Sequence, residues 1–544
     1  MPQTHVVFNQ VPPLVDYDAA DIPVLLEALE REGAGWAAPE LHELGRLAGS
    51  AEAQEWGRLA EAHPPELLTH DTMGNRIDEV RYDPAYHRLM ETAVGAGLHG
   101  APWRDDRPGA HVARAAKFMV WTTADAGHGC PISMTYSAVA ALRLAPELAA
   151  RYEPLLASPT YDPRTVPATE KAGIIAGMSM TEKQGGSDVR ANTTEAASTG
   201  DGAVSLTGHK WFTSAPMSDV FLVLAQAPGG LSCYLVPRVL PDGTRNAIHL
   251  QRLKDKLGNK SNASGEIEYD GALGWLVGEE GRGVRTIVEM VNSTRLDCTI
   301  GAAAGMQIGL ARAMHFAMHR KAFGRELVDQ PLMANVLADL AIEAEAATLL
   351  ALRLAGASDR AVRGDAREGL LRRLVLPAAK YHTTKRGPVH AAETLECFGG
   401  SGYVEESGMP KLFREAPVLS VWEGSGNVAA LDVLRAMARE PHAVDVFFDE
   451  VGLAAGADRR LDAAVEDLRA QLADASSLEV RARRVAESIA QVLAGSLLVR
   501  SGNSAVADAY CASRLGGDWG HAFGTLPVGT DTGAIMERAK PKPV

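Results

Sequence analysis

The sequence predicts an α+β protein in which an N-terminal helical domain, a central antiparallel β-barrel, a C-terminal helical bundle and an extra C-terminal helical extension follow one another. Three observations predict this order. Residues 1–176 are rich in Ala, Leu and Glu, which favour helices. Residues 177–280 hold short β-branched and aromatic runs between turn residues, which is typical of a barrel. Residues 281–440 return to long helical patterns with short joins, typical of a bundle, and residues 441–544 form the extension.

The composition indicates a globular protein of several domains. A chain of 544 residues is too long for one hydrophobic core, so about three or four domains are expected. With 46% hydrophobic and 22% charged residues, and no apolar run of about 18 residues, no membrane span is predicted. The net charge of −14 opposes bulk attraction to nucleic acid.

The termini and cysteines indicate a cytoplasmic protein. The segment Met1–Tyr17 lacks the basic and apolar regions of a secretory signal. The five cysteines occur singly, and no CxxC pair is present, so neither a zinc site nor a disulfide framework is predicted.

In the N-terminal domain, residues 22–30 and 37–59 are predicted to be helical. The cluster from His70 to Arg76 indicates a turn. Asp71 and His87 permit a catalytic pair, but polar residues around such a turn usually tie the loop, and we prefer that interpretation.

The barrel region begins with a glycine turn that carries several hydroxyl groups, Met178–Val189. Its Gly185-Gly186-Ser187 segment either cradles a phosphate through backbone N–H groups or is an ordinary loop. It lacks GxGxxG and GxxxxGK[ST], so neither a Rossmann nor a P-loop site is predicted. Strands are predicted at 203–207, 220–225, 232–236 and 247–250.

Long helices are predicted in the bundle at 284–318, 333–354 and 368–385, before Pro388. In the extension, apolar residues at helical spacing predict an antiparallel helical hairpin, and the segment from Gly516 is expected to pack loosely. The residues of that spacing are Leu461, Val465, Leu468, Leu472, Val485, Ile489 and Val492.

The stretch Val421–Asn427 places the carboxylate of Glu423 beside Trp422 and among small residues. Such residues leave room for a planar ligand to approach the backbone. A carboxylate in an apolar, partly dehydrated site has a raised pKa and can act as a base near neutral pH. The alternative is a solvated residue at a helix end.

These motifs, in this order, resemble the acyl-CoA dehydrogenase family. The residues that carry the resemblance are Met180-Thr181-Glu182, Gly185-Gly186-Ser187-Asp188, Trp211-Phe212-Thr213, Arg320-x-x-Phe323-Gly324, Gly399-Gly400-x-Gly402-Tyr403 and Trp422-Glu423-Gly424-Ser425. The length and further segments, among them Leu253–Asn259, resemble the AidB-like subgroup, flavoproteins of the adaptive response to DNA alkylation.

The resemblance implies FAD between the barrel and the bundle of a homotetramer, with Glu423 as catalytic base. Met180, Thr181 and Ser187 would line the flavin and its phosphates, and Trp211 and Thr213 would contact the isoalloxazine. Arg320 and Phe323 would reach the adenine half of FAD in a neighbouring subunit. The cofactor-binding set implied by the motifs is completed by Glu182, Gly185, Gly186, Phe212, Ser214, Glu396, Gly399, Gly400, Trp422, Ser425, Gly426 and Asn427.

The implied reaction is removal of the α-proton of an acyl-CoA thioester by Glu423, with hydride transfer to flavin N5 and reoxidation by an electron-transfer flavoprotein. Glu396 departs from the family, where many members have Gln before the Gly-Gly pair, and a carboxylate cannot donate that hydrogen bond unless protonated.

Two alternatives remain open. The first is a DNA-binding flavoprotein that protects against alkylation damage or repairs it, with Arg481, Arg483 and Arg484 as candidate contacts. However, residues 441–544 carry 11 Lys and Arg against 14 Asp and Glu, and such clusters are usually a solvated helix face. The second is a flavin-dependent oxidase of small alkylating compounds.

Overall fold

The computed structural model describes residues 4–200 and 202–542, and the chain divides into two compact units. A barrel unit comprises Glu52–Ala110 and Ala124–Asp297, and a helical unit comprises Met1–Ala51, His111–Thr123 and Cys298–Val544. The predicted α+β class, with helices before and after a central β-barrel, is confirmed.

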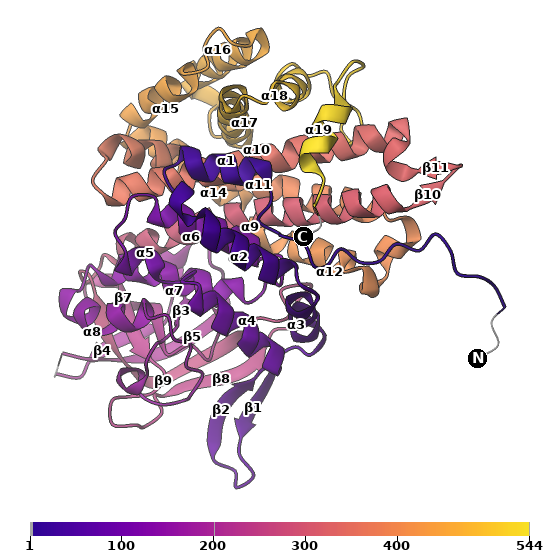
Figure 1. Cartoon of the computed structure of the whole chain (residues 1–544). Coiled ribbons are helices and arrows are strands. Elements are labelled where there is room, and N and C mark those ends of the chain that lie inside the picture. Colours follow the sequence, from indigo (N-terminus) through magenta and orange to yellow (C-terminus); the bar gives the residue numbers. More distant parts are fainter. Residues whose placement is uncertain (1–3, 201, 543–544) are drawn as a thin grey trace. The chain divides into compact units, whose positions relative to one another are not determined.

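Seven strands form one closed sheet in the barrel unit (Figure 1). Their order is β3-β5-β4-β6-β7-β9-β8, and the further pairings β3–β6 and β5–β9 close the barrel. Most neighbours are antiparallel, as predicted, but β3 and β4 each pair in parallel with β6. The strands are β3 (Ala176–Ser179), β4 (Glu195–Ser198), β5 (Val204–Ser214), β6 (Val220–Ala227), β7 (Gly230–Pro237), β8 (Ile248–Leu253) and β9 (Ser264–Val277).

Burial on both faces explains the apolar runs that predicted the central strands. On β6, Leu222 belongs to a core shared with helices α7 (Gly129–Leu142) and α8 (Pro146–Leu156). Its neighbour Val223 belongs to a second core with β5, β7, β8 and β9. Because successive side chains of a strand point to opposite faces, a strand buried on both sides is apolar throughout.

The N-terminal part of the barrel unit differs from the mainly helical prediction, because residues 66–81 form a hairpin of β1 (Glu66–His70) and β2 (Arg76–Arg81). In its turn, the Asp71 carboxylate accepts hydrogen bonds from the backbone N–H groups of Met73 and Asn75. His87 Nδ1 instead lies 2.9 Å from the Tyr161 hydroxyl. The loop-tying interpretation of Asp71 is therefore confirmed. The other helices of this region are α3 (Ala51–Ala62), α4 (Pro84–Gly95) and α5 (Ala101–Arg104).

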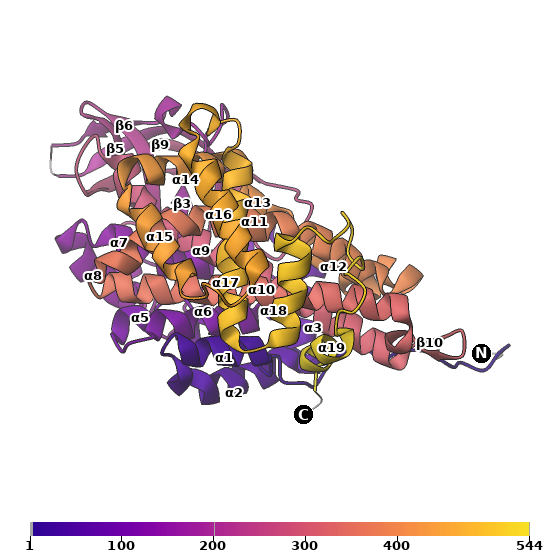
Figure 2. The same ribbon diagram turned by 90° about the horizontal axis from the view of Figure 1, so that it is seen from above.

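The three predicted long helices are α9 (Gly283–His319), α10 (Pro331–Val362) and α11 (Ala366–Glu396). The helical unit is built on α10, α11 and the part of α9 from Cys298 onward. The predicted end of the third helix at Lys385 is wrong, because α11 continues through Pro388. A proline removes one helical hydrogen bond, but the buried residues beyond it, such as His390, keep this segment packed. Helix α11 packs against α10, α14 (Gly426–Arg439) and α17 (Ala482–Ser501), all of which are labelled in Figure 2.

The extension forms the predicted helical hairpin from α16 (Arg459–Ala473) and α17 (Ala482–Ser501), with Leu468 and Val485 buried. The prediction that the segment from Gly516 packs loosely was wrong. Trp519 donates a hydrogen bond to Asp339 of α10, and the tail ends in α19 (Thr532–Ala539). The remaining helices of the unit are α1 (Pro23–Arg31), α2 (Ala38–Gly49), α6 (Ala110–Trp121), α12 (Met409–Glu415), α13 (Val418–Val421), α14 (Gly426–Arg439), α15 (His442–Gly452) and α18 (Ser504–Tyr510). Within the described residues, no helix is long and apolar enough to cross a membrane.

Candidate functional site

Glu423 stands on a sharp turn between α13 and α14 of the helical unit. Its φ is +56° and that of Gly424 is +101°, so two successive residues adopt left-handed backbone conformations. Ser425 then returns to an extended conformation as the N-cap of α14. Because a positive φ is unfavourable for residues with a Cβ atom, a Glu at this place requires support from the surrounding structure.

That support comes from Lys380 of α11, which the sequence analysis did not single out. Its Nζ atom binds backbone carbonyl groups of the turn. No sequence signal distinguishes it, because a lysine within a helical pattern is normally a solvated residue.

The start of α14 packs against the C-terminal extension. A Cβ atom on Gly426 would lie 3.0 Å from Nη2 of Arg483, 3.1 Å from Cε of Lys385 and 3.3 Å from a ring carbon of Tyr381. Only glycine fits here without displacing these side chains. Two cations therefore lie beside the first turn of α14, whose exposed N–H groups also favour an anion. Ser425 and Asn427 are exposed, and Trp422 is half-buried.

The glycine pair after α11 presents open backbone. Gly399 has a φ of +59°, and a Cβ atom added at Gly399 or Gly400 would meet no atom within 4 Å. Glu396, at the end of α11, is exposed as well. This segment can offer backbone N–H groups and one carboxylate to a ligand.

Phe323 occupies the tip of a two-stranded hairpin, β10 (Lys321–Ala322) and β11 (Arg325–Glu326), and is 98% exposed. Phe323 and Gly324 both have positive φ, which suits a two-residue hairpin turn. Asn9 ties the base of this hairpin, because its side chain donates to the Lys321 carbonyl at 2.9 Å and accepts from the Lys321 N–H at 2.8 Å. The Arg320 guanidinium donates to the Asn9 carbonyl.

In the barrel unit, the glycine loop after β3 is folded back on itself. The backbone N–H of Trp211 donates to the Thr181 carbonyl at 2.8 Å. A Cβ atom on Gly186 would lie 2.4 Å from the Thr181 hydroxyl. Gly185, Gly186 and Ser187 are exposed, whereas Met180 and Thr181 are half-buried. The loop thus presents glycine backbone and hydroxyl groups outward.

Glu182 anchors this loop from inside the barrel. Its buried carboxylate lies 2.8 Å from Nζ of Lys210 and accepts hydrogen bonds from the backbone and hydroxyl groups of Thr193 and Thr194. Burial alone would raise the pKa of Glu182, but these donors hold it well below its usual range. Burial lowers the pKa of Lys210 to about 8, against the opposing effect of Glu182.

Trp211 of β5 is half-buried and surrounded by cations. The Lys254 Nζ lies 3.2 Å from the centroid of its ring, and the Arg252 guanidinium lies 5.6 Å away. Glu266 binds both cations at 2.6 Å. Phe212 is exposed and Ser214 half-buried, whereas the buried Thr213 hydroxyl contacts that of Ser179.

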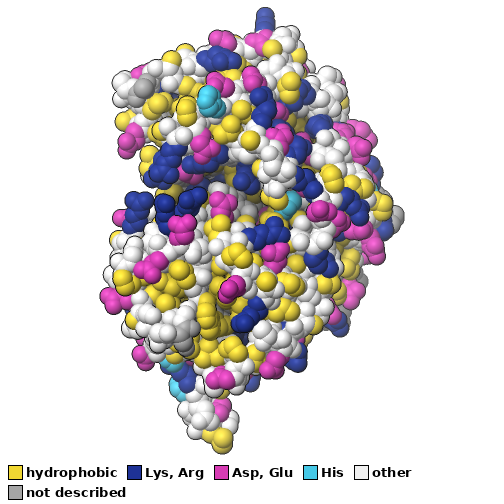
Figure 3. Space-filling model, turned by 90° about the vertical axis from the view of Figure 1, so that its left-hand side faces the viewer, with side chains coloured by type: hydrophobic (Ala, Val, Ile, Leu, Met, Phe, Trp, Pro, Cys, Tyr) yellow, Lys and Arg dark blue, Asp and Glu magenta, His cyan; other side chains and the backbone are white. Residues whose placement is uncertain are grey.

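The three candidate arginines of the extension are in different environments. Arg481 is occupied within its own hairpin, where it donates to the Gln471 and Asp474 carbonyls and to Ser477. Arg483 and Arg484 are exposed, and the Arg483 guanidinium lies 5.8 Å from the centre of the Tyr381 ring. On the face drawn in Figure 3, Lys and Arg side chains are interspersed with Asp and Glu.

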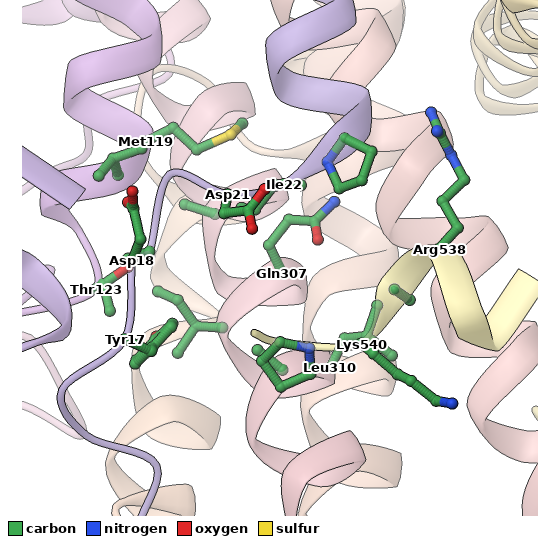
Figure 4. Close-up of a pocket in the computed structure, with 18 residues that line it drawn as sticks. Tyr17, Asp18, Asp21, Ile22, Met119, Thr123, Gln307, Leu310, Arg538 and Lys540 are labelled. Atoms are coloured by element: carbon green, nitrogen blue, oxygen red, sulfur yellow. The ribbon is translucent and has the colours of Figure 1, made fainter. Parts of the chain in front are cut away.

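A separate small pocket of about 50 Å³ lies in the helical unit (Figure 4). Its described lining includes Tyr17, Asp18, Gln307 and Arg538, and none of the candidate site residues. No group of three or more potential metal ligands occurs in the described part of the chain, and none of the five cysteines forms a disulfide.

Three segments of the chain match domains of known protein families. Residues 9–163 match the adaptive response protein AidB N-terminal domain. Residues 177–272 match the acyl-CoA dehydrogenase middle domain, and residues 281–438 match the acyl-CoA dehydrogenase C-terminal domain.

Individual proteins resemble the chain over nearly its full length. AidB of Escherichia coli (strain K12) is 46% identical over 516 residues, which cover 94% of this chain and 95% of that protein. The structure of Caenorhabditis elegans ACDH-11 in complex with C11-CoA superimposes with a TM-score of 0.85 at 27% identity, covering 100% of this chain and 94% of that one. An acyl-CoA dehydrogenase of Bacillus anthracis complexed with FAD shares the fold, with a TM-score of 0.63 at 19% identity over 79% and 77% of the two chains.

Proposed function

The chain belongs to the acyl-CoA dehydrogenase family, and we propose that it is an FAD-dependent oxidoreductase that acts on the CH–CH bond beside the carbonyl of an acyl-CoA thioester. One observation carries the proposal. Glu423, at the family's position for the catalytic base, stands on a left-handed turn that an ordinary loop would avoid. Strained backbone of this kind concentrates at functional sites.

The barrel residues fit the flavin. The loop with Gly185, Gly186 and Ser187 presents exposed backbone and a hydroxyl, which suits the flavin and its phosphates. Trp211 offers an aromatic ring for the isoalloxazine, and the cations near it favour an electron-rich partner. Glu182 would act indirectly, by holding the loop, because its carboxylate is committed to groups within the barrel.

The residues of the helical unit also fit. Gly399 and Gly400 would donate backbone N–H groups to the adenine half of the cofactor, whereas the Glu396 carboxylate can only accept. Ser425 and Asn427 add exposed polar side chains at the start of α14. The buried Gly426 lets Arg483 and Lys385 approach the same helix end, where negative charge is favoured.

In the proposed reaction, Glu423 removes the α-proton of the thioester. This proton is a weak acid, so the developing negative charge on the carbonyl oxygen must be met by hydrogen-bond donors. When bound, the flavin supplies the acceptor for the hydride that leaves the β-carbon. The protein's part is to hold the carboxylate within reach of the α-proton and to limit the access of water.

An anaerobic absorbance titration of the purified flavoprotein with short-, medium- and long-chain acyl-CoA thioesters tests this function. Bleaching of the flavin band by one class of thioester is expected and identifies the substrate class. A flavin that none of them reduces contradicts the proposal, and a protein that does not take up added FAD contradicts the cofactor assignment. Oxygen consumption with a small alkylating compound and no electron acceptor would support the oxidase instead.

The proposed partners are an electron-transfer flavoprotein, which would reoxidise the flavin, and further copies of the chain in a homotetramer. Phe323 supports the second, because an aromatic side chain exposed at a hairpin tip is suited to reach a neighbouring subunit. Light scattering tests this: F323S is expected to weaken the tetramer and its FAD binding together. Five cysteines without a disulfide fit a reducing cytoplasm, which we propose as the location of the protein.

A second candidate function is binding of alkylated DNA. The exposed Arg483 and Arg484 at the start of α17 favour it. Replacement of both by Gln is expected to weaken DNA binding and to reduce the salt dependence by about one unit for each phosphate that the protein no longer neutralises. Replacement of the exposed Arg58 and Arg88 of the barrel unit by Gln is the matched control. A shift assay that detects no binding at low salt excludes this function.

A further inference from the structure

Lys380 is completely buried in the middle of α11, and its amino group points at the turn that carries Glu423. Nζ lies 2.6 Å from the Gly424 carbonyl oxygen, 2.7 Å from that of Trp422 and 3.3 Å from that of Ser420. The three acceptors belong to alternate residues, from Ser420 in α13 to Trp422 and Gly424 in the turn. Two of them, Trp422 and Gly424, flank Glu423 directly.

This arrangement requires the charged form of the lysine. An ammonium group has three N–H donors, which matches three carbonyl acceptors, whereas a neutral amine has only two. A buried charge is stable only where polar partners replace water, and here the partners are backbone carbonyls that neither α13 nor α14 satisfies.

The same contacts determine the conformation of the turn. With the carbonyls of Trp422 and Gly424 both bound to one atom, the peptide group before Glu423 and the one after Gly424 both turn their oxygens toward Lys380 of α11. In this structure the backbone meets the condition within a sharp reversal, in which Glu423 and Gly424 both have a positive φ. Charge-assisted hydrogen bonds are strong enough to hold a non-glycine residue in this conformation.

We propose that Lys380 is a positioning residue that fixes the backbone of Glu423 and thereby the place from which its carboxylate acts. The inference rests on the proposed function, in which Glu423 is the base. It adds a role for a residue that touches neither substrate nor flavin. A base displaced by about 1 Å can lose about a hundredfold in rate, so the anchoring has a measurable catalytic consequence.

The test compares the wild-type holoenzyme with K380M, which retains the length of the side chain but removes the charge and its donors. K171M is the matched control, because Lys171 is a buried lysine of the barrel unit paired with Asp219 at 2.7 Å. K171M therefore also loses a buried ammonium group, but leaves the turn untouched. K380R, which keeps the charge in a planar group, is the second variant in case K380M does not fold.

Two readouts are needed. In hydrogen exchange, peptides covering residues 418–429 of K380M are expected to exchange at least about tenfold faster than in the wild type, and those of K171M at the wild-type rate. In steady-state turnover of the substrate thioester with an artificial electron acceptor, kcat is expected to fall about a hundredfold with KM changed less than about threefold. K380R is expected to show both effects with smaller amplitude.

The inference is overturned if the turn of K380M exchanges at the wild-type rate, or if the turn exchanges faster while kcat is unchanged. Failure of the proposed function has a different signature, because then no thioester reduces the wild-type flavin. In that case, hydrogen exchange still tests whether Lys380 holds the turn. Faster exchange of residues 418–429 in K380M supports this role, and unchanged exchange contradicts it.

Discussion

The guanidinium of Arg514 lies 2.6 Å from the carboxylate of Asp339, and both side chains are buried. Arg514 belongs to the C-terminal extension and Asp339 to α10, so this ion pair attaches the extension to the bundle. Glu343 lies 2.9 Å from the same guanidinium. The Trp519 indole N–H and the Gly524 backbone N–H also donate to Asp339.

Replacement of Arg514 by Met is expected to destabilise the protein by about 3–5 kcal/mol, because it removes the buried cation paired with Asp339. Glu343 keeps its second cation, Arg386, at 3.1 Å. Chemical denaturation measures the decrease in stability, and limited proteolysis should show the extension cut first. R58M is the control, since Arg58 forms an exposed pair with Glu55 and should change stability by no more than about 0.5 kcal/mol. An R514M protein as stable as R58M would contradict the anchoring role.

Glu182→Gln is expected to weaken FAD binding without changing the residues that would contact the cofactor. The amide leaves the buried Lys210 ammonium without its anion, and the glycine loop loses a charged anchor. Removal of such a hydrogen bond, roughly 1.5–3 kcal/mol, corresponds to about a tenfold to hundredfold higher dissociation constant for FAD. Retention of flavin after dialysis measures this. Glu195→Gln, an exposed change on β4, should retain FAD as the wild type does.

Glu423→Gln is expected to lower the rate of flavin reduction by at least about a thousandfold, because the amide cannot accept the α-proton. The FAD content and the affinity for the thioester should remain close to those of the wild type. Glu406→Gln, at an exposed carboxylate outside the candidate site, is the comparison. Rapid-mixing absorbance measures the rate, and a rate within about tenfold of the wild type would exclude Glu423 as the base.

His390 predicts a pH dependence of stability. Burial lowers its pKa from 6.5 to about 4, against the opposing effect of the Leu340 carbonyl, which lies 3.1 Å from Nε2. Between pH 6.5 and 4 the unfolded chain therefore binds a proton that the folded chain does not. The free energy of unfolding should fall as the pH falls through this window, by roughly 3 kcal/mol for this residue.

The change H390Q should reduce this slope, because an amide does not titrate. Part of the slope should remain, since burial also lowers the pKa of His111 to about 4. Denaturation series at several pH values between about 4 and 7 check the difference. An identical slope in H390Q and the wild type would assign the effect to other groups.

Helices and strands were predicted correctly where the local pattern of apolar and polar residues identifies them. Strand β6 was predictable because both of its faces are buried, which makes it apolar throughout. Strand β9 was missed, because acidic residues alternate with apolar ones along it and Gly271 interrupts it, with a φ of +87° where its pairing with β5 shifts register. A bulge of that kind depends on the partner strand, which is not visible locally.

The candidate site was predicted from the sequence only at residues that belong to a family motif. The family resemblance located Glu423, but not the lysine that binds its turn, because the three carbonyls are 40, 42 and 44 residues away from Lys380 in the chain. Arg481 is the opposite case. Its cluster suggested nucleic-acid contact, yet its donors are used inside the helical hairpin.

The burial of Lys380 also bears on chemical damage. Thioesters are acylating agents, and they react with neutral, accessible amines. Lys380 donates its hydrogen bonds to three carbonyl groups and is out of reach of solvent. Lys183, by contrast, is exposed beside the glycine loop. In the proposed enzyme, the lysine that positions Glu423 is thus buried where the acyl-CoA substrate cannot acylate it.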